Sequence, residues 1–379
     1  MKNLTTSISL ITLLTAAACS SQSTNQATVV PAEPVVNTVA IKPAIITDTV
    51  KHDTDDPAIW VNPSNPAESL IIGTDKNEDG ALYVFDLNGK VIEDKVVRGL
   101  KRPNNVDIEY GFMLNGQPTD IAVVTERMTH SLRIYALPDM QPIDNGGIPI
   151  FEGETETEYR DLMGIALYKS PATGKVYAIA GRKSGPTDGT YLWQYLLEDN
   201  SQGGVKATMV RKFGQYSGKK EIESIAVDDE LGYIYYSDEG VGVRKYYAEP
   251  DKGNEELALF ASKDFSKDHE GISIYKINDG TGYILVSDQE AGRFHIFTRE
   301  GTSQNPHQHE LVKITKVSTL ESDGSEVTSA ALNSTFPNGM FVAMSTDKTF
   351  QYYKWEDIAG KGLKLAPNGV VTSLQANKK

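Results

Sequence analysis

Short runs of alternating apolar and polar residues, rather than helical periods, recur along most of the chain. Tyr, Val, Ile and Gly are spread evenly through these runs, and signals for the start or end of a helix are scarce. A period of two is typical of strands that bury one face. The pattern therefore predicts an all-β protein.

These runs repeat as a larger unit. Each unit has three apolar runs separated by turns, and six units follow one another. The first run of each unit contains an apolar anchor, and successive anchors are 49, 57, 60, 47 and 58 residues apart. The anchors are Ile59, Ile108, Ile165, Ile225, Ile272 and Ala330. Six units of three or four strands predict a six-bladed β-propeller, with residues 42–372 as one domain. We expect a strand at Ile45, Ile46 and Val50 to close the ring with the last unit.

The N-terminus has the pattern of an export signal. Lys2 precedes an apolar run, Leu4–Leu14, which is too short to span a membrane, and three alanines then precede Cys19. This predicts a lipoprotein-type signal peptide over residues 1–18 with lipidation of Cys19. A plain signal peptide cut near Ala18 is the alternative.

The segments that flank the propeller are predicted from composition. Residues 19–41 are rich in Ser, Thr, Gln, Asn, Val and Pro without a helical period, which predicts a flexible tether, and residues 373–379 form a C-terminal tail. Ser20 after the lipidated residue favours an outer-membrane lipoprotein, and a periplasmic or extracellular protein is the alternative. We expect a monomer that meets a membrane only through a lipid anchor at Cys19.

Charge and cysteine content exclude several functions. Cys19 is the single cysteine, so disulfides within the chain and cysteine-based zinc sites are excluded. The chain has 37 Lys and Arg against 51 Asp and Glu, a net charge of −14. A generic nucleic-acid binder needs a basic face, so no nucleic-acid partner is expected. Taken alone, the acidic balance also disfavours a polyanionic substrate.

The repeat aligns polar residues as well. Four residues before each anchor stand Asp55, Asn104, Asp161, Glu221, Asp268 and Glu326, with Asp56, Asp107, Glu223, Glu270 and Asp323 nearby. Loops that lead into the inner strands of a propeller face the mouth of its central channel, so these groups are expected to converge there. Oxygen ligands without His or Cys select a hard cation, calcium before magnesium. The alternative is that these side chains accept hydrogen bonds from turn amides.

A second set of polar residues follows the second apolar run of each unit. It consists of Asp75-Lys76, Glu126-Arg127, Arg182-Lys183, Asp238-Glu239, Asp288-Gln289 and Asp347-Lys348. Its cations gather in the first three units and its carboxylates in the fourth and fifth. Lys and Arg suit phosphate oxygens, so Lys76, Arg127, Arg182 and Lys183 beside a cation site predict a phosphate site. Individually, each is better explained as a partner in a surface salt bridge.

Several motifs, in order along residues 50–360, resemble those of the β-propeller phytases, the bacterial 3-phytases of the Bacillus alkaline type. They are Asp55-Asp56-Pro57-Ala58-Ile59-Trp60, Asn104-Asn105-Val106-Asp107-Ile108, Ala226-Val227-Asp228-Asp229-Glu230, Tyr247-Ala248-Glu249-Pro250-Asp251, Glu270-Gly271-Ile272 and Phe336-Pro337-Asn338-Gly339. No P-loop, Arg-His-Gly segment or Gly-x-Ser-x-Gly elbow is present.

The resemblance implies a function and a set of site residues. It implies calcium ligation by Asp55, Glu223, Asp238, Glu270 and Gln289, and phosphate contacts from Lys76, Arg127 and Arg182 or Lys183. Together with the repeat alignment, Asp56, Glu221, Glu239, Asp268, Asp323 and Glu326 complete the predicted set of ligands to several calcium ions. Glu223, Glu270, Lys76 and Arg127 are the predicted catalytic residues.

The resulting hypothesis is a calcium-dependent phytase. Phytate would bind as its calcium salt, and a water acidified by calcium would attack phosphorus in line, releasing inorganic phosphate. Calcium at the channel mouth would reverse the local sign of the acidic charge. A calcium-dependent propeller lactonase and a non-catalytic lipoprotein propeller that binds a partner are the alternatives.

Two features depart from the family pattern. Met163 precedes Gly164 where the family would place a tyrosine, which removes one phenolic contact to phosphate. The acidic loop from Glu321 to Glu326 is shorter than in better-known members, which would alter a calcium site formed by Asp323 and Glu326.

Overall fold

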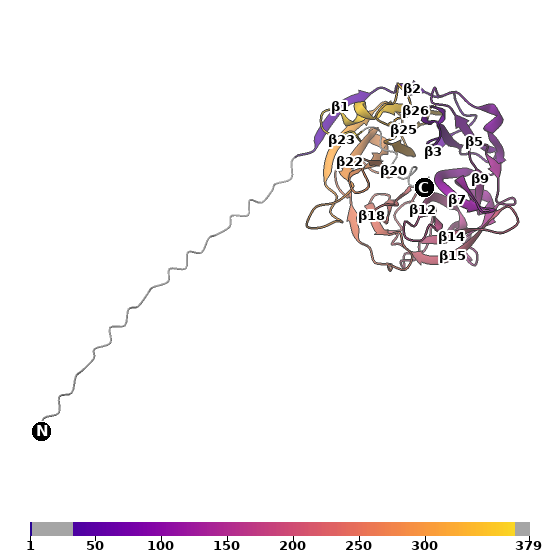
Figure 1. Cartoon of the computed structure of the whole chain (residues 1–379), viewed down its shortest axis with the longest axis horizontal. Helices are drawn as coiled ribbons and strands as arrows, with labels where there is room; N and C mark the ends of the chain where they lie inside the picture. Colours follow the sequence, from indigo (N-terminus) through magenta and orange to yellow (C-terminus); the bar gives the residue numbers. More distant parts are fainter. Residues whose placement is uncertain (2–32, 368–379) are drawn as a thin grey trace. The chain divides into compact units, whose positions relative to one another are not determined.

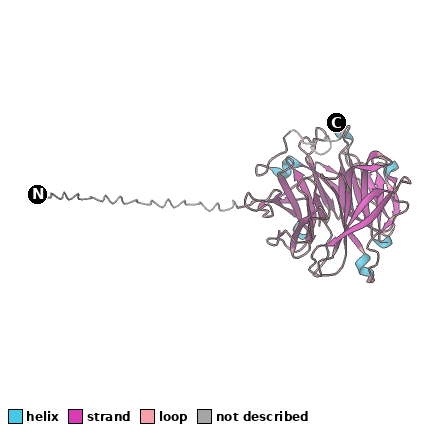
Figure 2. Cartoon of the chain, turned by 60° about the horizontal axis from the view of Figure 1, so that its bottom comes forward, coloured by secondary structure: helices cyan, strands magenta, loops and turns pink. Residues whose placement is uncertain are grey.

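The computed structural model describes residue 1 and residues 33–367. Figure 1 shows six β-sheets arranged as blades around a common axis, and Figure 2 shows that helices are confined to short segments. The prediction of an all-β, six-bladed propeller is therefore confirmed.

Each blade is built from consecutive antiparallel strands, with the first strand innermost. Blade 1 contains β3 (Thr54–Trp60), β4 (Leu70–Asp75), β5 (Gly80–Phe85) and β6 (Val97–Leu100). Blade 2 contains β7 (Pro103–Leu114), β8 (Gln117–Glu126), β9 (Ser131–Ala136), β10 (Gln141–Pro142) and β11 (Ile148–Pro149). Blade 3 contains β12 (Leu162–Lys169), β13 (Val176–Arg182), β14 (Leu192–Asp199) and β15 (Val205–Phe213).

The other three blades follow the same order. Blade 4 contains β16 (Ile225–Asp228), β17 (Tyr233–Asp238), β18 (Gly242–Tyr247) and β19 (Ala258–Phe260). Blade 5 contains β20 (His269–Lys276), β21 (Gly282–Asp288), β22 (Arg293–Thr298), β23 (Leu311–Val317) and the added strand β1 (Val35–Ile41). Blade 6 contains β24 (Ser325–Thr328), β25 (Met340–Ser345), β26 (Thr349–Lys354) and β2 (Ile45–Ile46).

Short helical segments lie between strands or, for the α-helix, after the last strand. They are η1 (Pro66–Glu68), η2 (Glu93–Lys95), η3 (Arg127–Thr129), η4 (Thr157–Arg160), η5 (Gln289–Ala291) and the α-helix α1 (Trp355–Ala359). In the part of the chain that is described, no helix is both long and apolar enough to cross a membrane.

The hydrophobic core lies between the blades. Each pair of neighbouring blades shares one cluster of buried apolar side chains, and Ile71 and Phe350, for example, join blades 1 and 6. A central strand is therefore covered on both faces, which explains why β4 and β25 are buried along their whole length. This packing fixes the inner strands around the axis.

The N-terminal segment closes the ring as expected. In β2, Ile45 pairs with Tyr352 and Ile46 pairs with Gln351 of β26. The outermost strand of blade 6 thus comes from the chain that precedes blade 1, which joins the first and last blades.

The flexible tether predicted over residues 19–41 includes residues that form a strand. Residues 35–41 form β1, which pairs in parallel with β23, and Val35 lies opposite Lys313. The outer edge of β23 offers free backbone groups, and a Val- and Ile-rich segment satisfies them. The propeller therefore begins at residue 35 rather than 42. The predicted signal peptide, Cys19 and the C-terminal tail lie outside the described residues.

The first strand of blade 6 also differs from the prediction. It spans Ser325–Thr328, ahead of the expected run from Ala330 to Leu332. Ala330 and Leu332 lie in a turn, where the amide of Leu332 donates to the Phe336 carbonyl, and both side chains are buried between blades 6 and 1. Their apolar character reports burial and not strand formation.

Candidate active site and metal centre

The inner strands of all six blades begin at the same end of the propeller axis. Because neighbouring strands are antiparallel, the second strands end at the same place. In blades 1, 2, 3 and 5 the inner strand begins with a bulge, for example between Thr54 and Pro57. A bulge turns side chains out of the blade. Polar residues at these positions are thereby placed at the axis end.

We call the residues at the equivalent position ahead of each inner strand's regular pairs the inner ring. Each lies two residues before the first regular pair of its inner strand. They are Asp55, Asn104, Met163, Glu223, Glu270 and Asp323. The predicted alignment was correct for Asp55 and Asn104, but Asp161, Glu221 and Asp268 lie two residues too early and Glu326 three too late. The choice of anchor causes this shift in the first five blades. Ile59 and Ile108 lie two residues after the first regular pair of their strands, whereas Ile165, Ile225 and Ile272 belong to that pair.

Lys76 connects three blades at this ring. Its Nζ lies 2.5 Å from Asp55 Oδ1, 3.6 Å from Asp323 Oδ2 and 3.9 Å from Glu223 Oε1. Burial alone would lower the pKa of Lys76, but these three carboxylates outweigh burial and raise it. Lys76 is therefore a fixed positive charge at the centre of the site.

Three glutamates stand together beside Lys76. Ligand atoms of Glu223, Glu239 and Glu270 all lie within 4.8 Å of one another. Glu223 Oε1 and Glu270 Oε2 are buried without a hydrogen-bond donor in the described structure. Burial, followed by repulsion from neighbouring carboxylates, raises the pKa of both groups well above the ordinary value. Buried carboxylate oxygens that lack donors fit a hard cation, so these residues are suited to hold a metal ion.

The remaining ring carboxylates are held by their neighbours. Asp55 accepts a hydrogen bond from Asn104 Nδ2 at 3.1 Å in addition to its contact with Lys76. Gln289 of η5 donates to Asp323, and burial, followed by repulsion from Asp55, raises the pKa of Asp323 to about 7. The structure thus brings Asp55, Gln289 and Asp323 to the ring end that was predicted for them.

Tight contact between inner strands keeps the ring narrow. The amide of Gly271 donates to the Asp323 carbonyl at 2.6 Å, and the amide of Gly324 donates to the Asp55 carbonyl at 3.2 Å. A Cβ at Gly324 would lie 2.5 Å from that carbonyl oxygen. Glycine is needed here because one blade's backbone touches the next.

Asp238 does not join the glutamate cluster. Its carboxylate is fully buried and accepts from Ser217 Oγ at 2.7 Å, from the Ser217 amide at 3.0 Å and from Arg244 Nε at 2.9 Å. Successive residues of a strand point to opposite sides. Glu239, the next residue, therefore reaches the cluster, whereas Asp238 fastens blade 4 internally, which differs from its predicted role as a ligand.

Arg182 differs from its predicted role in the same way. Its fully buried guanidinium donates to the carbonyl groups of Tyr191, Thr190 and Tyr159 at 3.0–3.1 Å and pairs with Glu154 at 3.3 Å. With all three nitrogens engaged, it is not available to a phosphate. Of the two alternatives in blade 3, the structure leaves Lys183 accessible.

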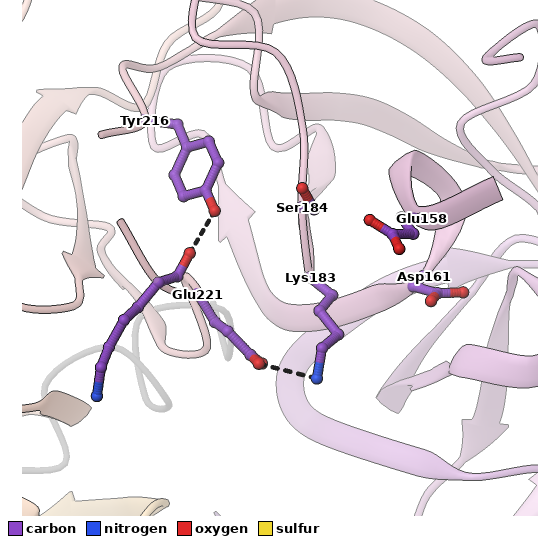
Figure 3. A pocket seen from close by; sticks show the side chains of 7 residues that line it. Glu158, Asp161, Lys183, Ser184, Tyr216 and Glu221 are labelled. Carbon is purple, nitrogen blue, oxygen red and sulfur yellow. Dashed lines mark hydrogen bonds and ion pairs between the residues drawn. The ribbon is translucent and has the colours of Figure 1, made fainter. Parts of the chain in front are cut away.

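Lys183 lines a pocket of about 310 Å³ next to the ring, shown in Figure 3. The pocket is lined by Glu158, Asp161, Lys183, Ser184, Tyr216, Lys220 and Glu221. Lys183 Nζ lies 2.8 Å from Glu221 Oε1, and Lys220 pairs with Asp268. The predicted ligands Glu221 and Asp268 thus lie at the rim, each paired with a lysine. Lys220 was not singled out from the sequence, because it stands outside both repeat positions.

Asp56 and Glu326 lie beside a further carboxylate in the inner strands. Asp56 Oδ2 accepts from the Val106 amide at 3.0 Å, and Glu326 Oε1 accepts from its neighbour Val327 at 2.6 Å. Burial and then repulsion from Asp107 raise the pKa of Glu326 to about 8. Neither residue belongs to the glutamate cluster.

Blade 3 contributes a thioether to the inner ring instead of an oxygen. Met163 is 1% exposed, and its sulfur contacts Arg127 Nη2. Arg127 Nε donates to the neighbouring Leu162 carbonyl at 3.0 Å. Burial lowers the pKa of Arg127, and the nearby Arg102 adds to this effect. Arg127 is therefore oriented by blade 3 toward the ring.

The fold and site define a β-propeller whose axis ends in donor-free carboxylates beside a lysine and an arginine, an arrangement suited to a cation and a phosphate ester. The sequence profile of the family described as phytase matches residues 2–362. The chain is 31% identical over 323 residues to the 3-phytase of Bacillus subtilis (strain 168), covering 80% of each protein. The chain belongs to the phytase family and is a phosphoric monoester hydrolase of the 3-phytase type.

Similarity to a solved structure is weaker. The Dos1 propeller matches 79% of this chain and 67% of its own, with a TM-score of 0.40 and 10% sequence identity.

Proposed function

We propose that the protein is a calcium-dependent phytase that releases inorganic phosphate from inositol hexakisphosphate. The observation that supports this most is the donor-free glutamate cluster, in which Glu223 Oε1 lies 3.9 Å from the ammonium group of Lys76. Glu223 thus belongs to the proposed metal site and also lies beside the lysine that is proposed to bind phosphate. Membership of the phytase family supports the substrate.

The chemistry of the side chains indicates which residues would hold calcium and which would bind phosphate. Glu223, Glu239 and Glu270 would hold calcium, with Asp55, Gln289 and Asp323 close by. Calcium would supply positive charge toward the phosphate oxygens and would lower the pKa of the water that acts as nucleophile. Lys76 and Arg127 would bind the equatorial oxygens of the reacting phosphate, and Lys183 a neighbouring phosphate.

The reaction is proposed to proceed by direct displacement. Water attacks phosphorus in line with the leaving inositol oxygen, which departs as the alcohol, and inorganic phosphate is the second product. Because Lys76 carries a fixed positive charge, it stabilises the charge that develops on the phosphate oxygens without a proton transfer.

The net charge explains why calcium would be required for binding. A chain of net charge −14 repels a free polyanion, and the site itself is rich in carboxylates. Phytate is therefore proposed to bind as its calcium salt, whose cations face the ring.

Phosphate release from calcium phytate by the purified protein is the direct test. Phosphate should appear in millimolar calcium and should cease when a chelator removes calcium. A lactone assay and a partner-capture assay run in parallel. Hydrolysis of a lactone without phosphate release would replace the proposal by a propeller lactonase, and inactivity in both assays by a binding protein.

The combined Lys76→Ala and Arg127→Ala variant tests which residues bind phosphate. We expect turnover to be abolished, while calcium still raises the thermal midpoint, because the glutamate cluster remains. Lys90→Ala is a matched control, since the Lys90 side chain is 70% exposed and, among the described residues, pairs only with Asp48 on the surface. Unchanged turnover in the double variant would place the site elsewhere.

Export is a separate part of the proposal. We propose that Cys19 is lipidated and that the mature protein is a monomer held at the outer membrane. Cys19→Ala should move the protein from the membrane fraction to the soluble fraction and abolish fatty-acid labelling. Retention of the label in that variant would contradict this assignment.

A further inference from the structure

Arg102 lies in the turn between β6 and β7, at the same end of the propeller as the inner ring. Its amide donates to the Asn77 carbonyl at 2.8 Å, and its carbonyl accepts from the Arg127 amide at 3.0 Å. Asn77 directly follows Lys76. The backbone of Arg102 is therefore fixed between the two residues proposed to bind the reacting phosphate.

The backbone of Arg102 is strained. Its φ is +59°, in the left-handed region that glycine adopts readily and arginine does not. A turn that only had to link two strands would be more stable with glycine. An arginine kept at this position despite the cost points to a role of its side chain other than stability.

The guanidinium of Arg102 has no counterion within the described residues. It makes neither a hydrogen bond nor a salt bridge there, although the residue is half-buried. By contrast, Arg133, Arg244 and Arg299 each pair with a carboxylate at 2.6–2.9 Å. An unpaired arginine at a site for anionic ligands is a candidate ligand contact.

Arg102 also lies close to a like charge. After burial, the Arg102 charge is the next cause that lowers the pKa of Arg127. Two guanidinium groups without an anion repel each other, and oxygens of a bound anion between them would remove that repulsion. The pair is thus suited to an anion with several oxygen atoms.

We propose that Arg102 is a further phosphate-binding residue, which contacts a substrate phosphate adjacent to the one bound by Lys76 and Arg127. The substrate class that uses it carries at least two neighbouring phosphates, and a simple monophosphate does not reach it. This inference rests on the proposed function, since it assumes that the reacting phosphate binds at Lys76 and Arg127.

The test measures binding as well as turnover. The probe is the hexasulfate ester of inositol, a polyanion with no phosphate to release, titrated calorimetrically in calcium. Loss of one charge-assisted contact weakens binding by about tenfold or more, so Arg102→Ala should raise its Kd by that factor. The KM for phytate should rise similarly, with little change in kcat, and the KM for phenyl phosphate should stay unchanged. Arg98→Ala, which removes a surface arginine paired with Glu93, should leave every value unchanged.

Arg102→Gly separates a binding role from a structural one. Glycine relieves the left-handed backbone, so the thermal midpoint should be unchanged or higher while hexasulfate binding still weakens. A purely structural arginine would show the opposite, a lower midpoint with unchanged binding.

Two results would overturn the inference: Kd values of Arg102→Ala and Arg102→Gly equal to that of the unmodified protein, or no hexasulfate binding by the unmodified protein. The proposed function fails separately. If the unmodified protein releases no phosphate but the Arg102 variants lose hexasulfate binding, only the phytase proposal falls. If it releases phosphate and the variants bind normally, only the role of Arg102 falls.

Discussion

Met163 occupies the single inner-ring position without an oxygen or nitrogen, and its effect is exerted through Arg127. The thioether is a weak acceptor that fills the space beside the guanidinium, while the Leu162 carbonyl fixes Nε at 3.0 Å. Orientation of Arg127 in blade 2 thus depends on packing from blade 3.

Met163→Ala should disturb both packing and substrate binding. Truncation of a buried methionine destabilises by about 2–5 kcal/mol, and the loss of support for Arg127 should raise the KM for phytate several-fold. Met163→Leu keeps the volume, so its cost should be below about 1.5 kcal/mol. Urea unfolding and steady-state kinetics measure the two effects. An unchanged KM in Met163→Ala would show that Arg127 does not depend on this contact.

The protonation of His309 is also set by the contacts that its side chain makes. Its Nδ1 lies 2.7 Å from the Thr298 carbonyl and its Nε2 lies 3.1 Å from Lys245 Nζ. Burial lowers the pKa of Lys245 to about 7, and below that pH its ammonium group can only donate, so Nε2 accepts and Nδ1 donates. Burial, followed by the charge of Lys245, lowers the pKa of His309 to about 4.

The consequence is a loss of stability in acid. Between about pH 6.5 and pH 4 the unfolded chain binds a proton at His309 that the folded chain does not, so stability from this residue falls as pH falls. The full effect is on the order of 3 kcal/mol. His309→Gln should flatten this part of the pH–stability curve, as measured by urea unfolding from pH 4 to 7. Parallel curves for both proteins would contradict the assignment.

At the scale of elements, β1 extends the sheet of blade 5 beyond the repeat. It pairs in parallel with β23 near Val35, Val36 and Asn37, and again at Ile41. The strand covers an edge that would otherwise expose free backbone donors and acceptors. It therefore contributes to stability although it belongs to none of the six repeats.

Deletion of residues 1–41 should destabilise the propeller. A few backbone hydrogen bonds at about 1 kcal/mol each suggest a loss on the order of 2 kcal/mol. Deletion of residues 1–32 leaves β1 intact and is the control. Thermal midpoints that coincide for the two truncations would show that β1 adds nothing to the fold.

At the scale of the whole molecule, the placement of negative charge matters more than its total. Glu239 illustrates this, since burial, then Glu221 and Asp268, raise its pKa to about 8. Proximity of carboxylates destabilises the fold unless a cation lies among them.

The effect of Glu239→Gln on the thermal midpoint should therefore have opposite signs without and with calcium. In a chelator at pH 7 the substitution should raise the thermal midpoint, because folding no longer has to bury and protonate a carboxylate whose pKa is raised to about 8. In calcium it should lower the midpoint relative to the unmodified protein, because a ligand is lost. Glu198→Gln, on the surface of β14 beside Lys206, is the control and should show no such reversal. The same shift with and without calcium would argue against a cation at Glu239.

Local pattern was enough for the fold, whereas the repeat alignment placed only Asp55 and Asn104 correctly in the inner ring. The period of two, the six units and the strand at Ile45 that closes the ring are all read from the chain, because each reports local burial. Lys76 was found because polar residues recur after the second run of each unit, and Glu223 and Glu270 were assigned as ligands through the family resemblance. Arg102 was not found, since a single strained turn leaves no periodic signal.

The sequence by itself determined the all-β class, the six blades, the family and the residue types of the site. Tertiary structure decided which member of a polar pair is available at the site, Glu239 rather than Asp238 and Lys183 rather than Arg182. Side-chain direction depends on bulges and strand ends, which shift by one or two residues without changing the apolar pattern. The spatial distribution of the net charge of −14 was likewise decided by tertiary structure. Composition gives its sum, but only the meeting of the inner strands puts part of it where a cation can bind.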